Sequence, residues 1–209
     1  MKTSIAIEKL TLYDLEQMFH LHLVTDPTFF HEWQSDLPSL TIAEQERLQR
    51  VRAAYANLDR RSLLENTVKM AIVAPLLDLA GFFLPPFYVD TETPVKIVAE
   101  DAGKQLRGRM DVLVLMEQIW VLIIEAKRAE FSLKVGIPQV LAYMLAKPPS
   151  DRPLYGLVTN GSSFVFLKLV AGNQPRYAKS KEFILDQDEG LTLTLQIMKR
   201  LAREAIDYS

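Results

Sequence analysis

The chain has 209 residues, a length that fits one large domain. Hydrophobic residues make up 49% of it and charged residues 24%, which excludes a disordered or low-complexity chain. A net charge of −2 excludes nucleic-acid binding through bulk positive charge, although it leaves room for a local basic patch. The absence of cysteine excludes disulfides, thiolate zinc sites and cysteine nucleophiles, and it favours a reducing, cytoplasmic setting.

No segment has the character of a targeting signal or a membrane span. The first nine residues are too charged for a signal peptide. The most apolar stretches, 71–80 and 112–124, are shorter than the roughly 18 residues that a transmembrane helix needs. We therefore expect no membrane anchor and no membrane partner.

Residues 1–60 predict a helical N-terminal extension. Thr11 and Asp14 form a capping pattern before a short helix, and Thr41 with Glu44 forms a capping box before a helix that runs to about residue 57. We treat residues 61–209 as the core, with a C-terminal helix, of the same single domain.

After residue 60 the pattern changes from helix to strand. A third helix is predicted over about 61–79, with a kink at Pro75 and a C-terminal cap at Gly81. The segments that follow are predicted strands at 87–90, 95–100, 109–115 and 119–126, a helix at 134–146, strands at 154–159 and 163–169 around a two-residue Asn160-Gly161 turn, a further strand within 175–185, and a helix at 191–206. This order predicts an α/β fold in which helices flank a central mixed sheet.

Charged residues suggest chemistry in the two strands on either side of the turn at 117–118. Both strands are strongly apolar, and a charge inside them is costly unless it is exposed or paired. Asp111, Glu125 and Lys127 all lie at the end away from the turn, where a hairpin brings them together. A plain two-residue turn would pair Asp111 with Ile124, so we predict an odd loop or a β-bulge that lets Asp111 face Glu125.

Two converging carboxylates form a hard-oxygen site that suits Mg²⁺ or Mn²⁺. The carbonyl of Ala126, between Glu125 and Lys127, is a further potential ligand. An ammonium beside such a metal can orient an attacking water or stabilise negative charge on a phosphate. The pattern therefore predicts metal-assisted hydrolysis of a phosphodiester.

These residues resemble a known nuclease motif. Asp111 with Glu125-Ala126-Lys127 resembles the PD-(D/E)xK motif of restriction and repair nucleases. Gln139 and Tyr143 resemble the QxxxY motif of the RecB-like branch and of the N-terminal nuclease domain of type I restriction R subunits. Met110 stands where the motif has its proline, a departure that is common in this superfamily.

The segment around Glu65 also resembles the R-subunit domain, in which a helix glutamate completes the metal site. The resemblance covers about residues 61–169 and implies a restriction-endonuclease-like core of order αβββαβ. It implies a Mg²⁺- or Mn²⁺-dependent nuclease acting on DNA. The implied roles are metal ligation by Asp111, Glu125 and the Ala126 carbonyl, catalysis by Lys127, support of a metal-bound water or second metal by Glu65, and site support or substrate contact by Gln139 and Tyr143.

Other interpretations of these residues stay open. Glu65 could be a solvent-facing carboxylate favoured at a helix start, and Tyr143 could be a core residue with a satisfied hydroxyl. The alternative for the whole chain is a catalytically inactive nuclease-fold module that binds nucleic acid or protein. We assign no metal to His20, His22 or His31.

The 209 residues of the sequence contain no GxxxxGK[ST] phosphate-binding loop. We therefore expect any motor or modification activity to reside on a separate subunit. A homodimer, in which two sites would cut two strands, is a further option.

Overall fold

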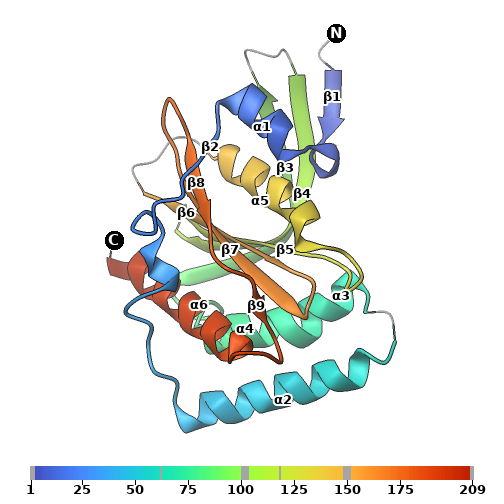
Figure 1. Cartoon of the computed structure of the whole chain (residues 1–209), viewed down its shortest axis with the longest axis vertical. Coiled ribbons are helices and arrows are strands. Elements are labelled where there is room, and N and C mark those ends of the chain that lie inside the picture. Colours follow the sequence, from blue (N-terminus) through green and yellow to red (C-terminus); the bar gives the residue numbers. More distant parts are fainter. Residues whose placement is uncertain (1–2, 62, 100–103, 118, 148–151, 208–209) are drawn as a thin grey trace.

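The computed structural model describes residues 3–61, 63–99, 104–117, 119–147 and 152–207. Within these ranges the chain forms one central mixed sheet with helices on both faces (Figure 1). The predicted α/β class is therefore confirmed. None of the helices in the described ranges is both long and apolar enough to span a bilayer.

The helices begin largely where the sequence predicts. They are α1 (Leu12–Phe19), α2 (Ile42–Leu58), α3 (Glu65–Val68), α4 (Ala74–Leu79), α5 (Gly136–Leu145) and α6 (Gly190–Asp207), with short turns η1 (Ile7–Lys9), η2 (His31–Trp33), η3 (Lys69–Val73) and η4 (Leu133–Val135). Both predicted capping boxes are present, because Thr11 and Asp14, and likewise Thr41 and Glu44, exchange side-chain to backbone hydrogen bonds.

The third predicted helix begins at Glu65, later than expected, and continues through η3 into α4. The η3 turn is π-helical and ends two residues before Pro75, whose missing N–H removes a regular helical hydrogen bond. Gly81 ends the helix with φ +85°, and the Phe82 N–H donates to the Leu77 carbonyl (3.0 Å). The predicted kink and cap are thus found in the form of a π-turn and a left-handed glycine.

The sheet has nine strands in the described part of the chain. They are β1 (Thr3–Ala6), β2 (His22–Leu23), β3 (Phe87–Ala99), β4 (Lys104–Met116), β5 (Ile119–Ala126), β6 (Leu154–Thr159), β7 (Ser163–Val170), β8 (Arg176–Lys179) and β9 (Phe183–Ile184). Their order is β1-β4-β5-β6-β7-β8-β2, with β3 on the other edge of β4 and β9 against β7. The pairs β1/β4, β5/β6 and β2/β8 are parallel and the other pairs are antiparallel.

Three sequence predictions need correction. The N-terminal 60 residues are not purely helical, because β1 and β2 join the sheet through β4 and β8. The strands predicted at 87–90 and 95–100 form one strand, β3, because both halves pair with the continuous strand β4; residue 100 lies outside the described ranges. The β6–β7 connection is longer than two residues, because Thr159 pairs with Phe164 and the Asn160 side chain accepts hydrogen bonds from backbone N–H groups of the loop.

The sheet separates two hydrophobic clusters. One cluster packs α2, the α3–α4 segment and α6 against one face, where Val112, Val114 and Ile124 point. The other packs α1 and α5 against the opposite face, where Leu113 and Ile123 point. Figure 1 shows these helices on both sides of the strands, and the β4–β5 hairpin therefore lies between two packed layers.

Candidate metal and catalytic site

A β-bulge in the β4–β5 hairpin sets the geometry of the candidate site. The pairing shifts by one residue between Val114 and Leu115, because Val121 is an extra residue on β5. Continued beyond its last pair, this register brings Asp111 opposite Glu125. The predicted bulge is confirmed, although Gln118 in the turn lies outside the described residues.

Asp111 connects two elements through its two carboxylate oxygens. It is buried, with 6% of its surface exposed. Its Oδ2 accepts a hydrogen bond from the Ala126 N–H (2.8 Å), where the β4–β5 ladder ends. Its Oδ1 accepts from Lys69 Nζ (3.0 Å), which comes from η3 on the helical layer. This carboxylate therefore joins the end of β5 to the helix that begins at Glu65.

Glu125 is more deeply buried, at 4% exposed. Its Oε1 accepts from Lys127 Nζ (2.7 Å), whereas its buried Oε2 has no hydrogen-bond partner among the described residues. Burial, and then the charge of Asp111, raises the pKa of Glu125 to about 7, although Lys127 acts in the opposite direction. An orphaned buried carboxylate oxygen is costly, and a divalent cation is a group that would satisfy it.

Glu65 lies at the start of α3, beside these two acids. Burial raises the pKa of Glu65 first, and the charge of Asp111 adds to this effect; a hydrogen bond shared with Asp111 acts in the same direction. The charge of Lys127 also reaches Glu65. The structure thus brings Glu65, Asp111, Glu125 and Lys127 together from three separate elements.

Gln139 and Tyr143 lie on α5, and Tyr143 contacts the β4–β5 hairpin. Both are buried, at 2% and 0% exposed. The Tyr143 hydroxyl donates to the carbonyl of Arg109 (2.9 Å), two residues before Asp111. Burial raises the pKa of Tyr143 strongly, while a hydrogen bond with Gln139 opposes this shift. The Tyr143 side chain therefore holds the backbone of β4 next to the carboxylates.

Lys69 and Glu92 belong to the same cluster, and the sequence analysis missed them. Lys69 Nζ binds Glu92 Oε1 (2.9 Å) as well as Asp111. Burial lowers the pKa of Lys69, but the hydrogen bonds to these two acids and their charges together raise it by more. Glu92 lies in β3 with φ +54°, a left-handed conformation that is uncommon for a residue other than glycine. The available signal was that Lys69 follows Glu65 by four residues, which places both on one helix face.

The carboxylates suit a divalent cation in chemistry, but lysines are bound to two of them. Among the described side chains, the trio whose potential ligand atoms all lie within 4.8 Å of one another is His31, Glu32 and Glu204, not the predicted acids. Asp111 is bound to Lys69 and Glu125 to Lys127. The unsatisfied oxygen of Glu125 is the observation that fits a metal at the predicted place.

Residues 14–175 match the family model of the type I restriction enzyme R protein N terminus. The chain belongs to this family. The resemblance to the R-subunit N-terminal domain is thus confirmed, and the match reaches further than the expected 61–169. No curated protein matches the chain.

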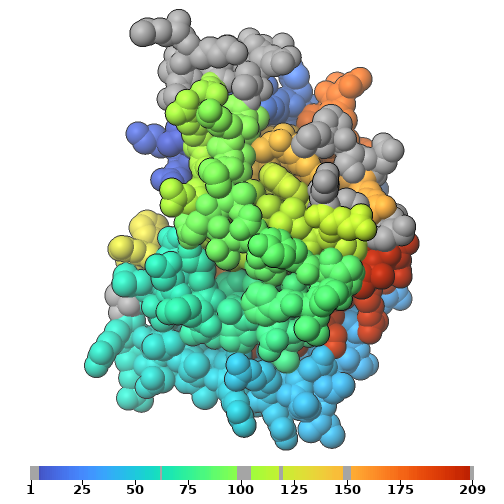
Figure 2. Space-filling model, turned by 180° about the vertical axis from the view of Figure 1, so that it is seen from behind, coloured from blue at the N-terminus to red at the C-terminus, as the bar shows by residue number. Residues whose placement is uncertain are grey.

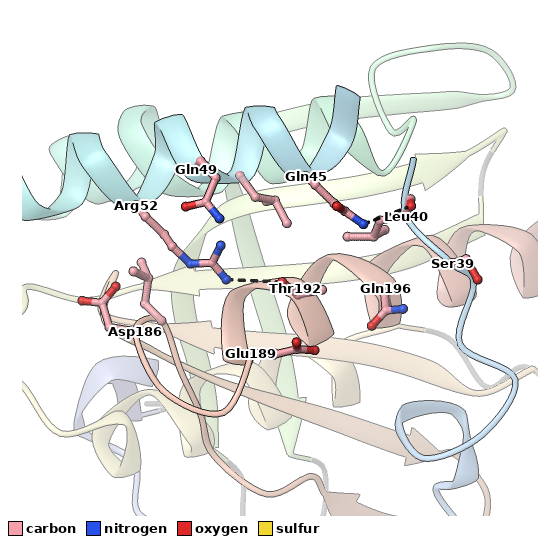
Figure 3. Close-up of a pocket in the computed structure, with 11 residues that line it drawn as sticks. Ser39, Leu40, Gln45, Gln49, Arg52, Asp186, Glu189, Thr192 and Gln196 are labelled. Atoms are coloured by element: carbon pink, nitrogen blue, oxygen red, sulfur yellow. Dashed lines mark hydrogen bonds between the residues drawn. The ribbon is translucent and has the colours of Figure 1, made fainter. Parts of the chain in front are cut away.

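This R-protein N-terminal domain has one cleft beside the candidate site and a second one that contains none of the site residues. A cleft of about 430 Å³ lies between the α3–α4 segment and β3, and Asp111 lines it. A larger cleft, of about 670 Å³, lies between α2 and α6 (Figure 3). Its wall is mostly polar, and Arg52 spans it to the Thr192 hydroxyl (3.3 Å). None of the predicted site residues lines this larger cleft.

Proposed function

We propose that the chain is a metal-dependent nuclease that hydrolyses phosphodiester bonds in DNA. The observation that carries this proposal is the meeting of Asp111 and Glu125 across the bulged hairpin, with Lys127 on Glu125 and one oxygen of Glu125 unsatisfied. Membership of a restriction-enzyme family supports a nuclease-related role on DNA.

The proposal includes a restriction-endonuclease-like core. The α3–α4 segment is followed by the antiparallel strands β3, β4 and β5, then by α5, and then by β6, which pairs parallel to β5. This succession agrees with the αβββαβ order that the resemblance implies. The helix and hairpin that carry the acids lie within it.

In the proposed reaction, Asp111, Glu125 and the Ala126 carbonyl would hold Mg²⁺ or Mn²⁺. When bound, such an ion polarises a phosphate oxygen and makes water a stronger nucleophile near neutral pH. Lys127 orients the water or neutralises charge on the phosphate. Glu65 extends the acidic donor set, while Tyr143, which is hydrogen-bonded to Gln139, holds the backbone of β4.

Plasmid cleavage with Mg²⁺ or Mn²⁺ tests this function. We expect cleavage by the unmodified protein and a loss of about 100-fold or more in Lys127→Ala, because removal of one group that stabilises developing charge has effects of this size. Lys134→Ala, a change at an exposed lysine in the same region, is the matched control and should cleave normally. Equal cleavage by Lys127→Ala, or none by the unmodified protein across metals and DNA forms, would contradict the proposal.

The second candidate is an inactive nuclease-fold module. The ion pairs of Asp111 with Lys69 and of Glu125 with Lys127 favour it, since they balance the acids without a metal. Calorimetry with Mn²⁺ discriminates the two: a nuclease binds the ion and its Asp111→Asn variant does not, whereas an inactive module binds it in neither form. A cytoplasmic location, a separate motor or modification subunit and a homodimer also remain proposals.

A further inference from the structure

The cleft beside Asp111 changes in character along its length. It runs between the helical segment 66–77 and β3, which lie side by side on the face shown in Figure 2, in teal and green. At the end that carries the candidate site, its walls are Lys69, Glu92 and Asp111. Further along the helix and β3, its walls are Val73, Leu77, Phe83 and Val89.

The apolar end does not suit a phosphate. Phosphates in protein–DNA complexes are held by lysine, arginine, small polar side chains or backbone N–H groups. Among the described residues that line this cleft, Lys69 is the cation, and its ammonium is bound to Asp111 and Glu92. A substrate group that extends from the candidate site into the apolar end of the cleft must therefore be largely uncharged.

The same end suits the flat face of a nucleobase. Phe83 lines it with 49% of its surface exposed, and Met70 lines the same cleft with 69% exposed. Aromatic side chains stack with bases of any sequence, and thioether sulfur makes favourable contacts with aromatic rings. A nucleotide has a phosphate at one end and an apolar face at the other, which matches the order of the cleft walls from Asp111 to Phe83.

We propose that this cleft receives an unpaired base of the DNA strand, next to the phosphodiester that is cut. The inference rests on the proposed function and specifies its substrate class: DNA with a single-stranded or extruded nucleotide rather than a continuous duplex. In a duplex, both faces of each base are covered by its neighbours, so a base reaches an apolar wall only when it leaves the stack.

Fluorescence anisotropy with three labelled DNAs tests the cleft. One duplex carries a single unpaired nucleotide, the second carries an abasic residue at that position, and the third is fully paired; Ca²⁺ replaces Mg²⁺, and a gel checks that the strands stay intact. We expect the unpaired base to improve binding about fivefold or more over the abasic site, the lower limit of base–aromatic stacking.

Phe83→Ala should remove most of this preference. Tyr88→Ala is the matched control, because Tyr88 lies on β3 beside Val89 and is 66% exposed, but it does not line the cleft. Met70→Ala provides a second variant, and thermal denaturation shows whether each variant is folded. Equal binding of all three DNAs, or an equal loss in Tyr88→Ala, overturns the proposal.

The experiments distinguish a failure of the base-binding proposal from a failure of the proposed nuclease function. A preference for the unpaired base without cleavage in any metal supports the cleft and defeats the nuclease. Cleavage of paired duplex that is unaffected by Phe83→Ala supports the nuclease and defeats the cleft. A change of oligomeric state in Phe83→Ala, without a change in DNA preference, identifies the surface as a protein interface and also overturns the proposal.

Discussion

At the scale of single residues, the candidate site depends on how buried acids are balanced. Glu125 has a lysine on one oxygen and no hydrogen-bond partner in the described structure on the other, and its pKa is raised to about 7. Its charge therefore changes near neutral pH. Asp111 differs, because both of its oxygens accept hydrogen bonds.

The raised pKa of Glu125 predicts a pH-dependent cost in the metal-free protein. The folded pKa lies above the unfolded value of 4.5. The contribution of this carboxyl group to the free energy of unfolding is therefore fully present below about pH 4.5 and is lost as the pH rises through 7. Glu125→Gln does not titrate, so we expect its stability relative to the unmodified protein to improve by up to roughly 3 kcal/mol between pH 4.5 and 8. Urea unfolding in EDTA measures this change. A difference that is the same at both pH values would contradict it.

The ion pair of Lys69 with Asp111 predicts that Lys69 competes with a metal ion for this carboxylate. Its ammonium is bound to Asp111, a proposed ligand, so a cation that binds there must displace it. We expect Lys69→Met to bind Mn²⁺ several-fold more tightly in calorimetry, because the competing charge is gone. Lys96→Met, at an exposed lysine of β3, should leave the affinity unchanged. Weaker binding in Lys69→Met would instead mean that this lysine preserves the ligand geometry.

At the scale of elements, α5 lies close to the sheet because glycines face it. A Cβ on Gly156 would overlap Val140, and a Cβ on Gly108 would lie 2.9 Å from a ring carbon of Tyr143. The close approach lets the Tyr143 hydroxyl reach the backbone of β4. The close packing of α5 against the sheet therefore contributes to the position of Asp111.

Gly156→Ala tests this close packing of α5 against the sheet. We expect a loss of about 1–3 kcal/mol of unfolding free energy, which is typical of overpacking, and partial recovery when Val140→Ala is added. A double-mutant cycle from chemical denaturation measures the coupling, with Val140→Ala alone as the reference. Strictly additive effects of the two changes would show that they do not clash.

The elements also show which features could be read from sequence. The bulge followed from side-chain alternation, because apolar residues fix the faces of β4 and β5 and leave Asp111 and Glu125 out of register in a plain hairpin. The strands β1 and β2 could not be predicted, since they are four and two residues long and depend on distant partners. Lys69 was missed for a similar reason: its contact with Glu92 joins residues far apart in the chain.

At the scale of the whole molecule, a largely buried polar network joins the segment before α2 and the C-terminal helix to the sheet. The Tyr155 hydroxyl on β6 lies 2.8 Å from a carboxylate oxygen of Glu32 and 2.8 Å from one of Glu204 on α6. Lys168 on β7 also binds Glu32, and Arg200 binds Glu204 (2.9 Å). The network therefore links the segment before α2 to the C-terminal helix.

Tyr155→Phe tests the network. Loss of the hydroxyl leaves the buried carboxylate of Glu32 and the partly buried carboxylate of Glu204 without their shared partner, so we expect about 1–3 kcal/mol of destabilisation. Chemical denaturation measures this loss, and hydrogen exchange should rise first in residues 26–40. Tyr88→Phe, at an exposed tyrosine, is the control. Unchanged stability in Tyr155→Phe would mean that the carboxylates are satisfied without the hydroxyl.

The helix α6 lies beyond residue 175, where the family match ends. Its buried residues Leu191, Leu195, Met198 and Leu201 belong to the same hydrophobic cluster as Phe30 and several residues of β5. A fragment trimmed to the matched region would expose this apolar surface to water and would be prone to aggregate. We therefore expect that a stable fragment of this protein must extend beyond the matched residues 14–175 and retain the C-terminal helix.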